Sequence, residues 1–91
     1  MADVVITLKI MPEGVDVDLN KIKEEATKRI ADFGGEVGKS EEVPVAFGLK
    51  SLNLFFVMDE KKGSTEKLED DISDIPGVQS VEVTDVRRAI G

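Results

Sequence analysis

The sequence predicts an α+β fold in which four antiparallel strands form one sheet and two helices cover one of its faces. Three observations support this prediction. Several stretches alternate hydrophobic and polar residues with a period of two, which is typical of strands. Two other stretches repeat their hydrophobic residues at steps of three and four, which is typical of helices. The stretches follow the order β-α-β-β-α-β, which indicates the split β-α-β, ferredoxin-like architecture.

The first strand and the first helix have clear boundaries. A strand is predicted over residues 3–11 by four alternating hydrophobic residues, Val4, Ile6, Leu8 and Ile10. Asp18 stands where the N-cap of the following helix should be. One face of that helix is hydrophobic and consists of Leu19, Ile22, Ala26, Ile30 and Phe33. Gly34-Gly35 ends the helix, because glycine adopts the left-handed conformation at little cost.

The remaining elements differ in how clearly they are marked. Residues 36–47 predict a weak edge strand, since Pro44 cannot donate a hydrogen bond to a sheet. A third strand begins at Lys50, and one face of it carries Leu52, Leu54, Phe56 and Met58. Ser64 or Thr65 caps a second helix, whose hydrophobic stripe is Leu68, Ile72 and Ile75. Pro76-Gly77 ends this helix, and the last strand begins at Val78 and ends near Arg87.

We expect the whole chain, residues 1–91, to form one domain, because a chain of this length supports only one small core. Right-handed crossovers predict that the first and last strands lie side by side in the middle of the sheet. Neither strand carries an aromatic residue, whereas an RNA-binding sheet has aromatic residues on its central strands. Together with the net charge of −7, this disfavours direct binding to nucleic acid.

The composition also excludes several kinds of site. The chain has no Cys and no His, which excludes thiolate zinc sites, thiol nucleophiles and the commonest general base. The carboxylates are expected to be exposed and therefore to be poor general acids, so we expect no enzyme, no metal site and no cofactor. No stretch is long enough to span a membrane, and the N-terminus lacks the pattern of a signal peptide. The expected location is therefore the cytoplasm.

Three local motifs resemble ligand sites but have simpler interpretations. Residues 34–40 resemble a phosphate-binding loop, but they connect a helix to a strand, and Phe33 stands where the motif requires glycine. Residues 16–20 begin like a calcium loop, but Lys21 replaces its required glycine. An acidic cluster on the second helix could hold a weak divalent cation, although like charges at this spacing usually form a solvated face. It consists of Glu69, Asp70, Asp71 and Asp74.

Two segments are not explained by the fold alone. In residues 44–50, Gly48 interrupts the strand pattern beside Phe47, which marks a bulge or a tip. From the residues alone, we favour Phe47 as the last core residue of its strand over a Phe47 that is presented outward. Near the C-terminus, Arg87 and Arg88 stand on an otherwise acidic chain. They fit either a solubilising tail or a site for phosphate or carboxylate.

At these two segments the chain resembles the family of archaeal translation elongation factor 1-beta. The resemblance covers essentially the whole chain, and its motifs are Met11-Pro12-Glu13, the Pro-Val-Ala-Phe-Gly-Leu sequence of residues 44–49, and residues 77–88. The family is similar to the C-terminal exchange domain of eukaryotic elongation factor 1-beta. The resemblance implies a ferredoxin-like fold and guanine nucleotide exchange on the GTPase elongation factor 1-alpha, which delivers aminoacyl-tRNA to the ribosome.

The resemblance also implies four partner-binding residues, Phe47, Gly48, Arg87 and Arg88. In the eukaryotic relatives a Phe enters an apolar pocket of the partner, and Phe47 occupies its place here. A Lys near their C-terminus reaches the magnesium and phosphate site, and its position falls on Arg88. Arginine keeps the positive charge but is bulkier and forked. Pairing with acidic metal ligands or phosphate of the partner is therefore the alternative to displacing the metal.

A different class of function stays open beside this one. A small ferredoxin-like regulatory or ligand-binding module would use Phe55 and Val57 on the sheet face away from the helices, or would self-associate through its sheet edges. An acylphosphatase-like enzyme would need an arginine in the loop after the first strand, and residues 12–14 contain none.

Overall fold

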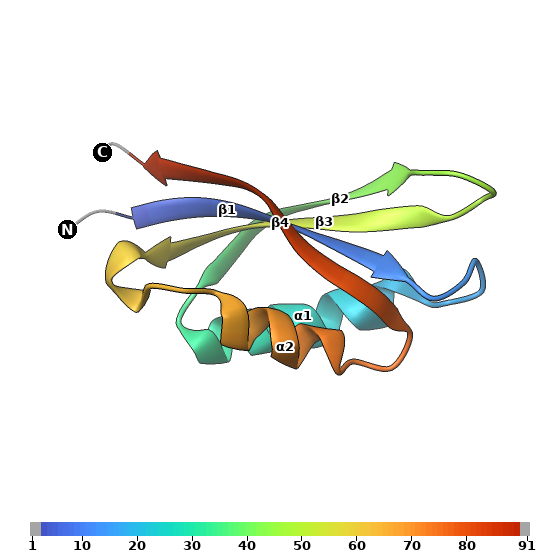
Figure 1. Cartoon of the computed structure of the whole chain (residues 1–91), viewed down its shortest axis with the longest axis horizontal. Coiled ribbons are helices and arrows are strands. Elements are labelled where there is room, and N and C mark those ends of the chain that lie inside the picture. The colour runs from blue at the N-terminus through green and yellow to red at the C-terminus, as the bar shows by residue number, and fades with distance from the viewer. Residues whose placement is uncertain (1–2, 90–91) are drawn as a thin grey trace.

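The computed structural model describes residues 3–89 and contains the helices and strands in the predicted order (Figure 1). They are β1 (Asp3–Pro12), α1 (Leu19–Phe33), β2 (Glu36–Pro44), β3 (Lys50–Asp59), α2 (Glu66–Ser73) and β4 (Val78–Ala89). A short 3-10 helix, η1 (Glu60–Lys62), lies in the predicted turn after β3. The strand β4 continues past the predicted end near Arg87, because Ala89 still pairs with Asp3. In the described range, no helix is long and apolar enough to cross a membrane.

The sheet has the strand order β2-β3-β1-β4, and all neighbouring strands are antiparallel. Both helices lie on the same side of the sheet (Figure 1). This arrangement confirms the predicted ferredoxin-like α+β fold, the edge position of β2, and the pairing of the first strand with the last.

The prediction that the first and last strands are both central was wrong, because β1 and β3 are the central strands and β4 is an edge. The physical reason is visible in β3, whose core-facing residues are all buried along its length, whereas β4 is exposed from Thr84 to Arg88. The related statement that the central strands lack aromatic residues was also wrong. The strand β3 carries Phe55 on the face away from the helices and Phe56 in the core.

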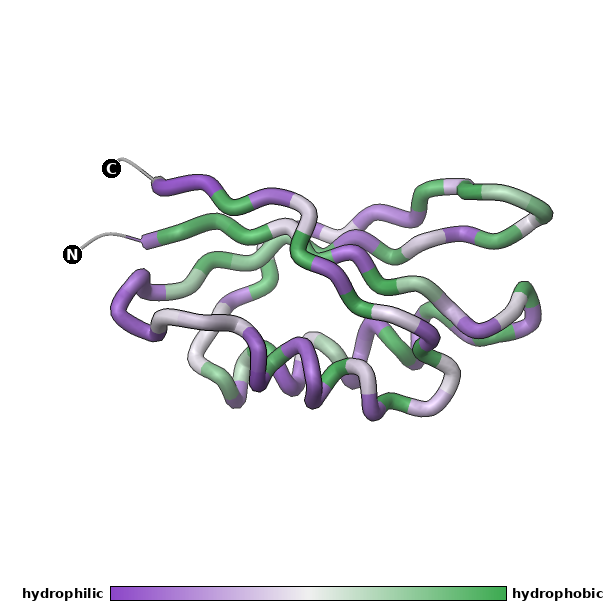
Figure 2. Tube along the Cα trace, viewed as in Figure 1, coloured by the Kyte–Doolittle hydropathy of each residue, from purple (hydrophilic) through white to green (hydrophobic). Residues whose placement is uncertain are grey.

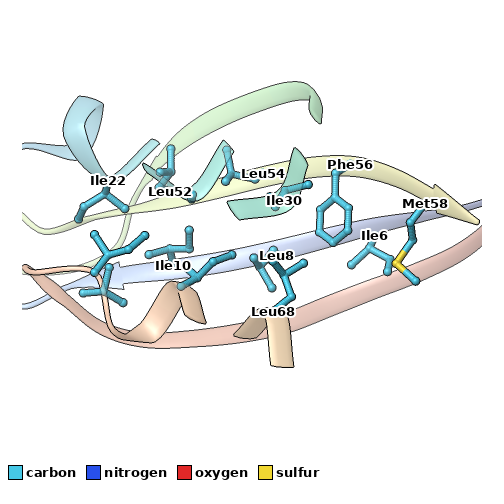
Figure 3. Packing of buried hydrophobic residues seen from close by; sticks show 14 residues of the cluster. Ile6, Leu8, Ile10, Ile22, Ile30, Leu52, Leu54, Phe56, Met58 and Leu68 are labelled. Carbon is cyan, nitrogen blue, oxygen red and sulfur yellow. The ribbon is translucent and has the colours of Figure 1, made fainter. Parts of the chain in front are cut away.

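The core forms between the sheet and the two helices, as the period of each element predicts. Hydrophobic and hydrophilic residues alternate along the chain in both helices (Figure 2). The side chains that β1 and β3 send toward the helices meet those of α1 and α2 in one cluster (Figure 3). Its buried members are Ile6, Leu8, Ile10, Ile22, Ala26, Ile30, Leu52, Leu54, Phe56, Met58, Leu68, Ile72, Ile75 and Val78. The helix-covered face of the sheet therefore holds the hydrophobic core of the described residues.

The ends of α1 have the predicted capping residues. The carboxylate of Asp18 accepts a hydrogen bond of 2.9 Å from the backbone N–H of Asn20, so Asp18 is the N-cap of α1. Gly34 follows the helix with φ of +105°, the left-handed conformation that glycine adopts without strain. Residues 34–40 then lead from α1 into β2, which confirms the helix-to-strand direction that argued against a phosphate loop.

The start of α2 resolves the choice between two capping residues. Thr65 occupies the N-cap position, but its hydroxyl donates to the carboxylate of Glu69 at 2.8 Å and does not cap the backbone. Ser64 accepts a hydrogen bond of 3.1 Å from the backbone N–H of Glu66. Ser64 therefore satisfies the first backbone donor of α2.

Phe56→Ala should lower the free energy of unfolding by about 3–5 kcal/mol, because Phe56 is fully buried and its removal leaves a cavity. Urea denaturation followed by circular dichroism measures this change. Phe47→Ala is the matched control, since the same atoms are removed from a side chain that is 97% exposed. It should change the free energy of unfolding by less than about 0.5 kcal/mol. Equal losses in the two variants would contradict this description of the core.

Candidate functional site

The hairpin between β2 and β3 ends in a tight turn. Pro44 is the last residue of β2, and the backbone N–H of Val45 then donates to the carbonyl of Leu49 at 2.8 Å. The N–H of Leu49 donates to the carbonyl of Ala46 at 2.9 Å. The strand predicted over residues 36–47 therefore ends three residues early, and the alternation through Phe47 does not place that residue in the core.

Phe47 has a backbone conformation that is unusual for its residue type. Its φ is +54°, and the φ of Gly48 is +79°. Two successive central residues with positive φ define a type I′ turn, whose first central position favours asparagine, aspartate or glycine. A non-glycine residue held in this region costs about 1–3 kcal/mol. Backbone strain at an exposed aromatic residue is a feature that functional sites often show.

The side chain of Phe47 points into solvent and is 97% exposed. The interpretation that we favoured from the residues alone, a core phenylalanine at the end of its strand, is therefore wrong. The reason is the turn itself, because the left-handed conformation at Phe47 and Gly48 reverses the chain before the side chain can reach the core. The alternative, a phenylalanine presented outward at a tip, is what the structure contains.

Sequence reasoning missed several other exposed hydrophobic residues at the same end of the sheet. Val43 and Val45 flank Pro44 and are 37% and 49% exposed. Val15, in the loop between β1 and α1, is 67% exposed. The available signal was a single valine between Gly14 and Asp16, in a loop where neither strand nor helix periodicity requires a hydrophobic residue.

Arg87 and Arg88 lie on β4 and point to opposite faces of the sheet. Arg87 pairs with Val5 and Arg88 with Val4, and neighbouring residues of a strand alternate between faces. The Nε atom of Arg87 lies 2.8 Å from the carboxylate of Asp85. The two arginines therefore do not form one binding site, because a ligand on one face of the sheet would contact only one of them.

Arg88 is held by an acidic residue of η1. Its Nη2 and Nε atoms donate to the same carboxylate oxygen of Glu60, at 2.5 Å and 3.1 Å. The hydrogen bond and the charge of Glu60 raise the pKa of the Arg88 guanidinium above its ordinary value, so Arg88 is always positively charged. Both groups remain open to solvent, with about two thirds of the Arg88 side chain exposed. Arg88 and Glu60 therefore form a surface ion pair, which contributes little to stability and leaves Arg88 able to exchange Glu60 for another anionic group.

The structure does not bring the two predicted segments together. The partner of Arg88 across the sheet is Val4, which pairs in turn with Met58 at one end of β3. Pro44 pairs with Lys50 at the other end of β3. These ends are eight residues apart, or about 26 Å at the rise of a strand. The hairpin turn and the end of β4 accordingly lie at opposite ends of the long axis (Figure 1).

The sheet face away from the helices carries the residues of the alternative interpretation. Phe55 is half-buried there, and Lys39 covers it with Nζ 5.5 Å from the ring centroid. The same ammonium group pairs with Glu41 at 2.9 Å, and Val57 is 36% exposed. Within residues 3–89, the exposed part of this face is a mixture of charged and apolar groups around one covered ring.

Comparison with known proteins gives a consistent family. The model of the EF-1 guanine nucleotide exchange domain matches residues 5–89 of the chain. The chain is 50% identical over 88 residues to elongation factor 1-beta of Methanothermobacter thermautotrophicus, with 97% of this chain and 98% of the relative covered. It is 47% identical over 88 residues to elongation factor 1-beta of Methanobrevibacter smithii, with the same coverage of 97% and 98%. Elongation factor 1-beta of Staphylothermus marinus is 40% identical over 89 residues, with 97% and 98% covered.

Solved structures of low sequence identity share the fold. The ACT domain from GTP pyrophosphokinase of Chlorobium tepidum has a TM-score of 0.60 at 21% identity and covers 89% of this chain and 97% of that domain. The C-terminal domain of the MgtC protein from Mycobacterium tuberculosis has a TM-score of 0.61 at 14% identity, with 98% and 88% covered. At these identities the similarity concerns the arrangement of strands and helices alone.

Phe47→Asn should raise the free energy of unfolding by about 1 kcal/mol, because asparagine tolerates the left-handed conformation that strains a phenylalanine. Urea denaturation measures this change. Ala46→Asn is the control, since it adds the same side chain one residue earlier, where φ is not positive. A Phe47→Asn variant that is no more stable than the original protein would show that the turn carries no strain.

Proposed function

The chain belongs to the elongation factor 1-beta family of guanine nucleotide exchange factors, and we propose that it releases GDP from elongation factor 1-alpha by contacting this GTPase with both ends of its sheet. The hairpin turn supplies an apolar contact through Phe47, supported by Gly48. The opposite end supplies a cation, Arg88, for the region of the partner where magnesium and phosphate are bound. The observation that supports the proposal most directly is the aromatic ring of Phe47, which is 97% exposed on a strained turn.

An exposed phenylalanine in this conformation is costly unless a partner covers it. Burial of a phenylalanine side chain releases about 1.5–3 kcal/mol, and single aromatic anchors of this kind often dominate protein interfaces. Gly48 permits the turn because glycine adopts its φ of +79° without strain. The pair is therefore suited to enter an apolar pocket, the role that the family resemblance gives to this phenylalanine.

The charged end would act on the nucleotide site. Magnesium bridges the phosphates of GDP to a GTPase, and a fixed cation that approaches this site competes with the metal or pairs with its acidic ligands. Arg88 has a planar, permanently charged group that matches carboxylate and phosphate. Arg87 points to the other face of the sheet, so we assign it an auxiliary role in long-range attraction.

Exchange follows from the different affinity of the factor for the two states of the partner. If this protein binds the nucleotide-free GTPase more tightly than the GDP complex, it must weaken the binding of GDP to the GTPase in the same ratio. A coupling free energy of about 4 kcal/mol corresponds to an affinity for GDP that is about a thousandfold lower. No covalent step, cofactor or metal of the factor's own is needed, and the proposed role involves neither nucleic acid nor membrane. The whole chain would act as one exchange domain in the cytoplasm, where translation takes place.

Release of a fluorescent GDP analogue from purified archaeal elongation factor 1-alpha tests the proposal. Sub-stoichiometric amounts of the factor should accelerate release, because an exchange factor turns over. The maximal rate and the factor concentration that gives half of it should be measured separately. With an active GTPase, a release rate that does not change would refute the proposal.

Arg88→Ala should lower the maximal rate of GDP release about tenfold or more, because a charged hydrogen-bond donor is lost from the nucleotide site. Arg87→Ala, which removes an identical side chain from the opposite face, should lower the rate about twofold or less. Stopped-flow fluorescence at saturating factor measures both rates. Exchange that persists unchanged when both arginines are removed would show that the mechanism at this end is wrong.

Glu60→Gln should raise the apparent affinity for the GTPase about two- to fivefold at low ionic strength, because Arg88 no longer has to leave a carboxylate partner. The gain should shrink as salt is added, since exposed charges are screened. Glu66→Gln is the control, because it removes the same charge from the first turn of α2. A lower affinity for Glu60→Gln would instead show that Glu60 orients Arg88 for binding.

A further inference from the structure

The hairpin end of the sheet carries most of the exposed large hydrophobic side chains of the described residues. Four of them, Val15, Val43, Val45 and Phe47, lie there, and only Val57 and Val86 lie elsewhere. The tube along this hairpin end is hydrophobic, whereas the far end of β4 is hydrophilic (Figure 2). We propose that Val15, in the loop between β1 and α1, is a second apolar contact residue for the GTPase beside Phe47. This inference rests on the proposed exchange function.

Val15 and the hairpin turn form one surface although they come from separate loops. A Cβ atom at Gly48 would lie 3.6 Å from Cγ1 of Val15, which is ordinary van der Waals contact. A hollow of about 300 Å³ lies between the loop and the base of the hairpin, and Val15 and Gly48 both line it. A partner that covers the ring of Phe47 and approaches Gly48 would therefore also meet Val15.

The loop that carries Val15 is held in place at both ends. The backbone N–H of Glu13 donates to the carbonyl of Gly77 at 2.8 Å, which ties the loop to the start of β4. Val17 packs against the core two residues after Val15. These contacts restrain the backbone on both sides of Val15, so less conformational entropy is lost when a partner covers this residue.

The position of Val15 beside the hairpin turn indicates the occupant. A single exposed valine is common on protein surfaces, and it gains meaning only as part of a continuous apolar patch. The loop also carries the acidic residues Glu13, Asp16 and Asp18. Val15 is its one exposed large hydrophobic residue in the described structure. We assign to Val15 the apolar rim of the pocket on elongation factor 1-alpha that receives Phe47, because Val15 lies beside Gly48, the residue that follows Phe47 in the turn.

Two substitutions of opposite charge test this assignment. Val15→Asp and Val15→Lys should each raise the factor concentration for half-maximal GDP release about tenfold, since either charge would be desolvated against an apolar rim. The maximal rate should not change, because the cation at the far end is untouched. Asp16→Asn is the control in the same loop and should leave the half-maximal concentration unchanged. Thermal melts confirm that each variant is folded.

The outcomes separate this inference from the proposed function. If Phe47→Ala raises the half-maximal concentration and both Val15 variants do not, the contact at Val15 is refuted and the exchange function stands. If Val15→Asp and Val15→Lys shift the half-maximal concentration in opposite directions, the loop acts through its charge, and the apolar contact is refuted. A concentration series by analytical ultracentrifugation tests whether a second copy of this chain, and not the GTPase, covers Val15. Loss of a dimer in Val15→Asp, with exchange unchanged, would overturn the inference.

Discussion

The architecture depends on the register between β1 and β3, the two central strands. Eight consecutive residue pairs, from Asp3 with Asp59 to Ile10 with Leu52, align the hydrophobic residues of both strands on the face that the helices cover. A slip by one residue would turn either set to solvent, so the hydrophobic effect enforces this register strongly. The positions of the two candidate segments follow from it. One end of the pair leads into the hairpin turn of Phe47, and the other end receives the last residues of β4.

Sequence periodicity predicts the secondary structure well because both periods are strong in this chain. The helix α1 has its predicted hydrophobic face and its predicted caps at Asp18 and Gly34. The position of β4 could not be derived in the same way, since the rule for crossovers gives its neighbour and not which strand closes the edge. The clue was polarity: a strand that ends in Thr84, Asp85 and two arginines has too few hydrophobic residues for a central place.

The candidate site was less accessible from the sequence than the fold. Alternation of Val43, Val45 and Phe47 suggested a strand, and a strand would have buried the ring. The turn at Phe47 and Gly48 overrides that pattern, because two residues with positive φ reverse the chain at once. The separation of Arg87 from Arg88 follows from strand geometry and needed only the knowledge that both lie within β4. Val15 could be recognised only from the structure, which places its side chain beside Gly48 of the hairpin turn.

Both edges of the sheet carry an irregularity together with charged residues. The strand β2 shifts register between Val37 and Lys39, and β4 shifts at the position of Thr84. Bulges of this kind, flanked here by Lys39 and Asp85, distort the row of free backbone groups that another strand would need. The sheet is therefore a poor template for edge-to-edge aggregation. This protection covers the two edges of the sheet and leaves its two ends, where Phe47 and Arg88 lie, accessible.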